Sequence, residues 1–447
     1  MKTKRFGLNK GFFSRGWLIA VLLVMLFTTA CEGLPIEIEL PWVNTPAPTK
    51  ETELPVNITG TPTPSSLEPE PTLTAETGAD KLIVWLPPEL SPHEETMAGH
   101  LLQEKLNSFA HDNKVEIIVR VKAQTGSGSL TDSLTAANLA APAILPDIIA
   151  LSATDLQLAA TRDLIYSHTR MSEMMNDTDW YPFGREVSLV NGEVLGIPLL
   201  SNPLSLVYNE ASLLVPSNDW TAIKDNFGIF GFAADDSQAK YLLLLYIAAG
   251  GNVMDAQGHA ILEEGPLIEA LTVLKEGLGT LHISTLSTGF QTEDQVWDGF
   301  LNRSLDTAVV PVELVLNQQD EIENQPDPAF TQPEITLGTA MAWALGNPDP
   351  ARQEIALDLI SELTETEFLS SWSEALGFLP ARPSALGAWK NPNLKPALEK
   401  IAQATRLYPP EEVINRLGPA LRNATLLILR DGADPIETAK TTIESIK

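Results

Sequence analysis

From residue 81 onward, short apolar runs alternate with segments of helical periodicity, and this alternation constrains the fold more than any other feature of the sequence. The apolar runs 81–86, 115–121 and 147–151 are typical of buried strands. Between them, 93–111 and 130–140 have the spacing of amphipathic helices. Strands and helices that alternate through short loops indicate an α/β layered domain with a mainly parallel sheet. Parallel strands are covered on both faces, which accounts for their near-continuous apolar composition.

The middle of the chain departs from this rhythm. Asn191-Gly192 is a tight-turn dipeptide between two short apolar runs, so it predicts a β-hairpin. The run 204–209 predicts a strand, and a section rich in helices follows it. We expect further strands at 307–312 and 338–345, and helices at 238–249, 266–278, 351–363, 367–375, 392–405, 410–430 and 436–446.

The N-terminus carries an export signal. A basic stretch precedes eleven apolar residues, 17–27, which is too short for a bilayer span of about 20 residues but typical of a secretory signal. Thr28-Thr29-Ala30 leads into Cys31, the only cysteine, and this order resembles a bacterial lipobox. We expect a signal peptide at 1–30 and a lipidated Cys31 at the outer face of the cell membrane. Cleavage by the ordinary peptidase and an uncleaved anchor helix remain alternatives, because Thr28 stands where leucine is usual.

Residues 31–79 have the composition of a linker. Nine prolines and nine threonines occur in 32–79, with glutamates scattered among them. Such a segment predicts an extended, disordered tether between the anchored Cys31 and a folded body at 80–447.

The charge of the chain excludes one class of partner. Removing the five basic residues that precede Cys31 leaves 24 Lys+Arg against 58 Asp+Glu, a net charge of −34. This acidity argues against nucleic-acid binding, because like charges repel the phosphate backbone. For the same reason we expect the protein to be a monomer.

Six stretches, in order, resemble one family. They are KLIVW, PDIIALSATDLQLAATRDLI, NGEVLGIPLLSNPLSLVYNEASL, AAGGNVMDAQGHAIL, ALGFLPARPSA and DGADPIETAKTTIESI. Together they make the folded body similar to extracellular solute-binding proteins of family 1, the sugar- and maltodextrin-binding lipoproteins of ABC importers. The third stretch is the most specific.

This resemblance implies a two-lobed α/β fold of the periplasmic-binding-protein type (type II), with a ligand cleft between lobes that crossover strands join. The crossovers would lie at 203–208, near 337–343 and near 377–381. Lobe 1 would then comprise about 81–203 and 343–378, and lobe 2 about 209–338 and 381–447.

Six residues are candidates for ligand contact, because sugar sites combine aromatic faces with polar groups that bind hydroxyls. They lie at strand ends or beside the expected crossovers: Trp85, Ser152, Asn202, Glu313, Trp343 and Arg382. The stretch 415–420 has no aromatic residue where the family usually has a stacking platform. Either Tyr408 replaces that platform or the ligand is not a stacked oligosaccharide.

The resemblance therefore predicts a receptor that captures a small polar solute, expected to be a carbohydrate, and delivers it to an ABC permease. The alternative is an extracellular hydrolase or a sensor with the same fold. We expect no enzyme, cofactor or metal site. Asp235-Asp236 precedes an apolar helix as capping residues would, and the six histidines lack the spacing of zinc ligands.

Overall fold

The structure is a computed structural model that describes residues 81–126, 128–209, 220, 228–280, 282–317 and 328–447. The chain divides into two compact units, Met1–Thr72 and Leu73–Lys447, and all described residues belong to the second. The predicted signal peptide, Cys31 and the linker lie outside the described residues.

The larger of two sheets among the described residues is mixed, and its main path runs in the order β2-β1-β3-β10-β6-β8-β7. β1 is parallel to β2 and β3, whereas β10 is antiparallel to β3 and β6 is antiparallel to both β10 and β8. The sheet is therefore parallel only in parts. Its strands are β1 (Lys81–Leu86), β2 (Glu116–Val121), β3 (Ile148–Ser152), β6 (Ile197–Asn209), β7 (Phe230–Gly231), β8 (Thr307–Pro311), β9 (Pro328–Phe330), β10 (Thr336–Leu345), β11 (Leu379–Pro380) and β12 (Thr405–Leu407).

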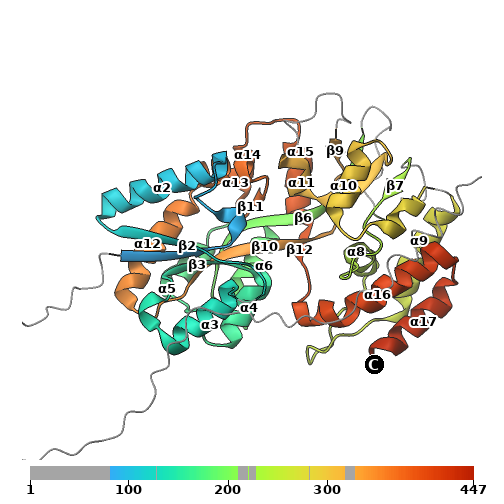
Figure 1. Cartoon of the computed structure of the whole chain (residues 1–447), viewed down its shortest axis with the longest axis horizontal. Coiled ribbons are helices and arrows are strands. Elements are labelled where there is room, and N and C mark those ends of the chain that lie inside the picture. The colour runs from blue at the N-terminus through green and yellow to red at the C-terminus, as the bar shows by residue number, and fades with distance from the viewer. Residues whose placement is uncertain (1–80, 127, 210–219, 221–227, 281, 318–327) are drawn as a thin grey trace, which may run out of the picture. The chain divides into compact units, whose positions relative to one another are not determined.

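The two longest strands join the lobes, and Figure 1 shows β6 and β10 running between the two groups of helices. The first half of β6 pairs with β10 and β11 in lobe 1, and its second half pairs with β8 and β9 in lobe 2. At the change of lobe, Gly338 faces Pro203 so closely that a Cβ on Gly338 would lie 2.7 Å from the Pro203 Cα. Only glycine fits this approach of the two crossover strands. β6 and β10 lie where the first two crossovers were expected.

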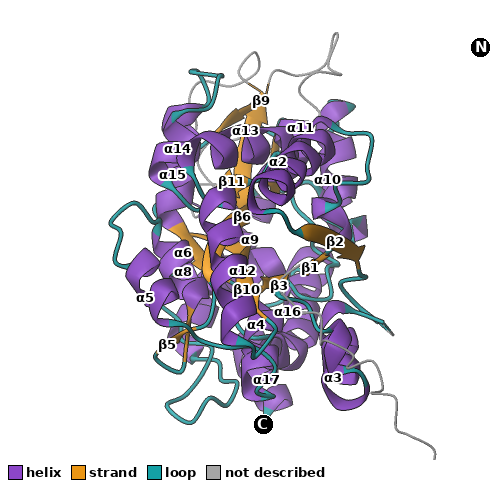
Figure 2. Ribbon diagram, turned by 90° about the vertical axis from the view of Figure 1, so that its left-hand side faces the viewer, coloured by secondary structure: helices purple, strands orange, loops and turns teal. Residues whose placement is uncertain are grey.

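Lobe 1 packs helices on both faces of β1, because successive side chains of a strand point to opposite faces. Leu82, Val84 and Leu86 pack in one cluster with α2, and Ile83 and Trp85 pack in another with α3 and α4. Figure 2 shows the strands enclosed by helices. The helices of this lobe are α2 (Met97–Asn113), α3 (Leu130–Ala140), α4 (Ala153–Thr161), α5 (Thr169–Met175), α6 (Pro182–Ser188), α12 (Pro350–Leu363), α13 (Thr366–Leu376), α14 (Pro383–Gly387) and α15 (Lys395–Ala404), with 3₁₀ turns at Pro88–Leu90 and Pro142–Ile144.

The predicted hairpin in lobe 1 is confirmed. β4 (Leu189–Val190) pairs with β5 (Glu193–Val194), and both turn residues, Asn191 and Gly192, have positive φ angles. This backbone geometry matches the primed turns that Asn-Gly favours.

Lobe 2 has its own apolar core. α8, α9, α16 and α17 pack against one another, and α10 packs against β8. α8 is buried on nearly every side, with Leu242, Leu243, Leu244 and Leu245 all at most 2% exposed. Each such leucine contributes roughly 1.5–3 kcal/mol by burial. The helices are α8 (Lys240–Ala248), α9 (Glu264–Gly279), α10 (Glu293–Leu301), α11 (Val312–Asn317), α16 (Glu411–Asp431) and α17 (Pro435–Ile446), with a 3₁₀ turn at Thr285–Gly289.

The expected third crossover near 377–381 is wrong. β11 pairs with Ser201 and Leu200 of β6, and α14 and α15 then pack against α13, α6 and β6 of lobe 1. Leu398 and Ile401 on α15 are fully buried there, which holds this segment in lobe 1. The chain crosses at β12, whose residues pair with the start of β10. Lobe 1 therefore extends to about residue 404, and residues 381–404 do not belong to lobe 2.

Across the described ranges, we find no helix with the length and apolar character needed to cross a membrane.

Candidate functional site

The carboxyl ends of parallel strands converge where the lobes meet, which is where open α/β sheets bind their ligands. β1 and β3 end at Leu86 and Ser152 on the lobe 1 side, and β7 and β8 end at Gly231 and Pro311 on the lobe 2 side. The residues that follow these ends form the candidate site.

Asn202 and Glu313 are the two predicted residues that the structure brings into contact. Asn202 lies on β6, and its Oδ1 accepts a hydrogen bond of 3.2 Å from the backbone N–H of Glu313 in α11. The Asn202 Nδ2 has no hydrogen-bond partner among the described residues. Within the described part of the chain, only the oxygen of this amide is engaged.

The carboxylate of Glu313 lies in a partly buried, acidic environment. Its Oε1 accepts a hydrogen bond of 2.9 Å from Asn317. Burial raises the pKa of Glu313 above its ordinary value, Asp294 adds to the rise, and the Asn317 hydrogen bond opposes it. A carboxylate in this setting gains from a ligand that donates hydrogen bonds.

Glu89 is the counterpart of Glu313 in lobe 1. It follows β1 and accepts a hydrogen bond from Gln124, which follows β2. Burial raises the pKa of Glu89, its backbone hydrogen bond lowers it, and the charge of Glu313 raises it further. Two carboxylates, one from each lobe, therefore repel each other across the site.

Ser152 ends β3 and caps α4. Its Oγ accepts from the Asp155 N–H at 3.1 Å and donates to the Asp155 Oδ2 at 2.7 Å. Burial raises the pKa of Asp155, the Ser152 hydrogen bond lowers it, and Glu411 at the start of α16 raises it. Asp155 in lobe 1 and Glu411 in lobe 2 therefore form a second pair of like charges, one from each lobe.

Tyr408 follows the third crossover strand. Its N–H donates to the Gly338 carbonyl at 3.1 Å, which ties it to the start of β10. Burial raises its pKa well above the ordinary value, and Glu293 and Asp236 add to this. Tyr408 is thus an aromatic residue beside the crossovers.

Trp85 and Trp343 are buried in the walls of lobe 1. Trp85 is 1% exposed, and the Lys122 Nζ lies 5.1 Å from its ring centroid. Trp343 is 0% exposed and stacks on Trp372 with ring centroids 6.4 Å apart. Both indole Nε1 atoms are buried without a partner among the described residues. In this conformation neither ring offers surface to a solute.

Arg382 is engaged by other residues of lobe 1. Its Nη1 lies 2.8 Å from Asp177 and 3.4 Å from Asp179, and its guanidinium carbon is 3.9 Å from the Trp180 ring centroid. Hydrogen bonding to Arg382 lowers the pKa of Asp177. These contacts fasten α14 to the loop before α6.

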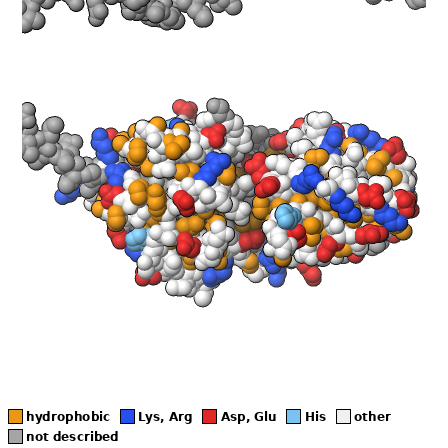
Figure 3. Space-filling view, turned by 90° about the horizontal axis from the view of Figure 1, so that it is seen from below, with side chains coloured by type: hydrophobic (Ala, Val, Ile, Leu, Met, Phe, Trp, Pro, Cys, Tyr) orange, Lys and Arg blue, Asp and Glu red, His pale blue; other side chains and the backbone are white. Residues whose placement is uncertain are grey.

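The surroundings contain no sign of a metal centre: among the described ranges, no group of three or more His, Cys, Asp or Glu side chains is arranged to hold an ion. Figure 3 shows acidic side chains over the face seen from below, with Lys and Arg interspersed among them. No broad basic area occurs on this face.

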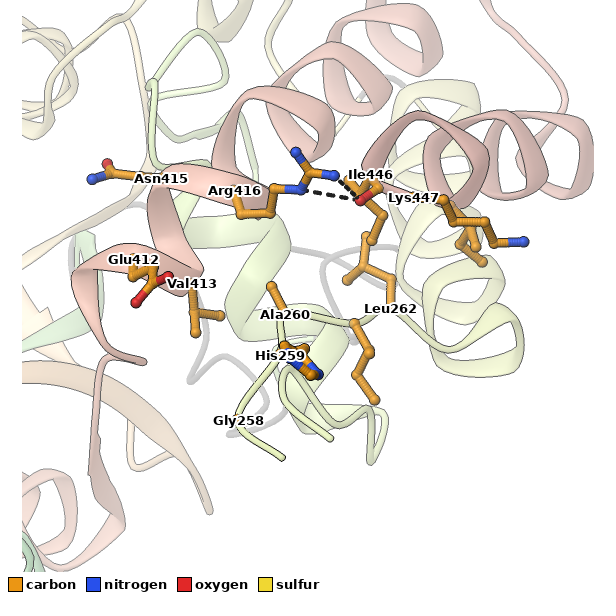
Figure 4. A pocket seen from close by; sticks show the side chains of 12 residues that line it. Gly258, His259, Ala260, Leu262, Glu412, Val413, Asn415, Arg416, Ile446 and Lys447 are labelled. Atoms are coloured by element: carbon orange, nitrogen blue, oxygen red, sulfur yellow. Dashed lines mark hydrogen bonds between the residues drawn. The ribbon is translucent and has the colours of Figure 1, made fainter. Parts of the chain in front are cut away.

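A separate pocket of about 700 Å³ lies within lobe 2, between residues 258–262, the start of α16 and the end of α17. Figure 4 shows Arg416 turned toward the Ile446 carbonyl, to which its Nε donates a hydrogen bond of 3.0 Å. None of the six predicted contact residues lines this pocket. It is therefore distinct from the site at the crossovers.

The sequence prediction missed Glu89, Gln124 and Asp155. Glu89 and Gln124 follow the ends of β1 and β2, and Asp155 is three residues beyond the end of β3. The rule that selected Trp85 and Ser152 would have selected the region after each strand, had it been extended by a few residues.

Comparisons with known proteins identify the family and the fold of the chain. Residues 106–397 match the profile of the family described as bacterial extracellular solute-binding protein. A search of curated protein sequences finds no match.

Among solved structures, a cyclo/maltodextrin-binding protein complexed with maltotetraose superposes with a TM-score of 0.65 at 16% identity, covering 83% of this chain and 97% of that chain. The maltose-binding periplasmic protein of Listeria monocytogenes gives a TM-score of 0.63 at 15% identity, covering 82% and 97%. The sugar-binding protein of Xanthomonas citri gives 0.64 at 14% identity, covering 82% and 96%. These likenesses establish the two-lobed binding-protein fold, and from the profile match we conclude that the chain belongs to the bacterial extracellular solute-binding protein family.

Proposed function

We propose that the protein is the substrate-binding lipoprotein of an ABC importer and that it captures a carbohydrate by closing its lobes. The observation that carries this proposal is the pair Asn202 and Glu313, which meet where β6 passes from one lobe to the other. A solute held by such groups contacts both lobes, and closure gains free energy only when both lobes touch it.

The ligand contacts follow from this arrangement. The Asn202 Nδ2 donates to the solute, Glu313 and Glu89 accept from its hydroxyl groups, and Ser152 lies at the same edge. Tyr408 is the nearest candidate for an aromatic face. Three of the predicted residues support the site without touching the solute, because they stabilise the packing of lobe 1: Trp85, Trp343 and Arg382.

Sugar is the solute class that fits best. The structural neighbours named above include proteins solved with maltotetraose and with maltose. Acceptor groups without an accompanying row of basic residues suit hydroxyl donors better than phosphates or carboxylates. The family and the neighbours are binding proteins, and nothing in the described site favours the hydrolase or sensor alternative.

Anchoring completes the proposal: lipid on Cys31 and the linker 31–79 would keep the monomeric receptor near the permease, outside the cytoplasm. The experiment that tests the function is a thermal-shift screen against glucose, maltose and longer maltodextrins. A solute that binds only the folded state raises Tm, by an amount equivalent to about 2.7 kcal/mol at 100 times Kd. A flat response to every carbohydrate, with a rise for an unrelated solute, would contradict the sugar assignment.

A further inference from the structure

A second pocket lies in lobe 1, between the α4–α5 connection, the β4–β5 hairpin and the start of α12. Its volume is about 590 Å³, within the roughly 300–1,000 Å³ that small-molecule sites occupy. We call it the hairpin pocket. Its lining residues are Ala160, Asp163, Ile165, Tyr166, Ser167, Val190, Asn191, Glu193, Leu195, Pro348 and Gln353.

The hairpin pocket and the site at the crossovers lie at opposite ends of β3. The Tyr166 N–H donates to the Leu345 carbonyl at 2.9 Å, and Leu345 pairs with Ile148, the first residue of β3. Ser152, the last residue of β3, belongs to the site between the lobes. A ligand in the hairpin pocket therefore touches lobe 1 alone and does not depend on closure.

The lining of the hairpin pocket is mostly polar, with three nearly buried apolar residues behind it. Ile165, Val190 and Leu195 are 6–8% exposed and form part of the lobe 1 core. Around them stand the side chains of five residues that form no hydrogen bond or ion pair with any described residue: Asp163, Tyr166, Ser167, Asn191 and Glu193. Their hydrogen-bonding capacity is open to a ligand.

Gln353 of α12 also lines the hairpin pocket. Its side chain is 7% exposed, and its Nε2 donates to the Asn347 carbonyl at 2.8 Å. Because that bond fixes the amide, its Oε1 is held in place, and this atom has no partner among the described residues. A nearly buried acceptor without a partner gains from a donor that reaches it.

The charges define the ligand class. Asp163 and Glu193 bring two carboxylates, and the lining includes no Lys, Arg or His, so phosphates and carboxylates are repelled. The Tyr166 ring suits the C–H face of a sugar ring, and the polar acceptors around it suit the hydroxyl groups. We propose that the hairpin pocket is a second binding site, separate from the cleft, for one or two rings of an uncharged, hydroxyl-rich sugar.

The test is saturation-transfer difference NMR on the full chain with glucose and maltose as probes. The double variant Asn202→Ala/Glu313→Ala, the cleft variant, should weaken sugar binding in the cleft, so the probes are used at concentrations too low to fill it. Tyr166→Ala removes the ring, and Glu193→Lys places an ammonium group on the exposed hairpin with little risk to folding. Glu173→Lys is the matched control, because Glu173 is exposed in the same lobe and does not line the pocket.

We expect sugar signals to persist in the cleft variant and to fall at least about fivefold when Tyr166→Ala or Glu193→Lys is added to that variant, with no change when Glu173→Lys is added instead. Glucose 6-phosphate should give no signal from the cleft variant. Loss of all signal in the cleft variant would overturn the proposal, since only one site would then exist. Equal signals in Glu193→Lys and Glu173→Lys would place any second site elsewhere, and preference for glucosamine over glucose would show that the pocket binds a positive charge instead.

A free sugar and the sugar units of a polymer share this chemistry. Sedimentation with starch granules separates them. Granules that deplete the cleft variant, but not its Tyr166→Ala derivative, would identify a polymer as the ligand. No depletion, together with the NMR signals, would identify a free sugar.

Discussion

Replacing Asn202 by alanine should reduce both the stability of the empty protein and its affinity for the solute. The Asn202 Oδ1 accepts from the Glu313 N–H, one of the first amides of α11, which have no acceptor within the helix. Losing this acceptor costs about 1–2 kcal/mol. A folded unit of roughly 370 residues unfolds with an entropy of about 0.8 kcal/mol per kelvin, so Tm should fall by about 1–3 °C.

The affinity for the solute tests the Nδ2 group of the same side chain. Asn202→Ala also removes the Nδ2 donor, which should weaken affinity about 5- to 150-fold, or about 1–3 kcal/mol. Asn202→Asp separates the two roles. It keeps an oxygen that accepts from the residue 313 N–H but has no donor for the solute. In a Glu313→Gln background, which removes the neighbouring carboxylate, its Tm should stay near that of Glu313→Gln alone.

The assay is differential scanning calorimetry of the empty proteins, followed by isothermal titration with the sugar that the thermal-shift screen identifies. If, in the Glu313→Gln background, Asn202→Asp lowered Tm as much as Asn202→Ala, the hydrogen bond to the residue 313 N–H would not be what stabilises this position. If both variants bound sugar like the parent, Asn202 would not be a ligand residue.

Three further predictions concern stability, pH and anchoring. Asp147 is 1% exposed and accepts hydrogen bonds from the Ile83 N–H, Asn347 and two nitrogens of Arg352. Arg352→Ala leaves this buried carboxylate short of donors, so it should lower the free energy of unfolding in urea by about 3–5 kcal/mol. Arg162→Ala, at an exposed position, should lower it little. The pKa values of Glu89 and Glu313 are raised above the ordinary 4.5, so just above pH 4.5 the folded state binds more protons than the unfolded state. The contribution of these two groups to stability is therefore present below pH 4.5 and is lost as the pH rises through their raised pKa values. Glu89→Gln/Glu313→Gln should therefore raise Tm at pH 7 and flatten this part of the pH profile, and an unchanged profile would contradict the repulsion. Cys31→Ser should release the protein from the membrane fraction or trap its precursor, and fractionation identical to the parent with a processed signal would refute lipidation.

Local patterns in the sequence predicted most of the elements, because each depends on residues close to one another in the chain. The strand at Lys81–Leu86 and the hairpin around Asn191-Gly192 are examples. Contacts between distant segments were harder to predict. Arg382 resembled a residue beside a crossover, but its partners Asp177 and Asp179 precede it by about 200 residues. The crossover at β12 depends on the burial of Leu398 and Ile401 against lobe 1, which the periodicity of α15 cannot specify.

The candidate site shows the same limit. A tryptophan on a strand that is covered on both faces is buried at any position along that strand. The sequence of β10 therefore could not show whether Trp343 packs in the core of lobe 1 or contacts a ligand. Part of the rise in the pKa of Glu89 comes from Glu313 in the other lobe, more than 200 residues away in the chain. Only the assembled sheet places these two carboxylates near each other.

Lobe closure on sugar is the central claim, and the distance between two spin labels tests it most directly. Cys31 is the only native cysteine, so a Cys31→Ser background accepts one label on exposed Glu104 in α2 of lobe 1 and another on exposed Glu269 in α9 of lobe 2, each introduced as cysteine. Double electron–electron resonance should show this distance changing to a new single distribution when maltose or a longer maltodextrin is added, and the Asn202→Ala/Glu313→Ala variant should need far more sugar for the same change. A distance that stays constant at a sugar concentration shown to saturate the parent would contradict capture by closure.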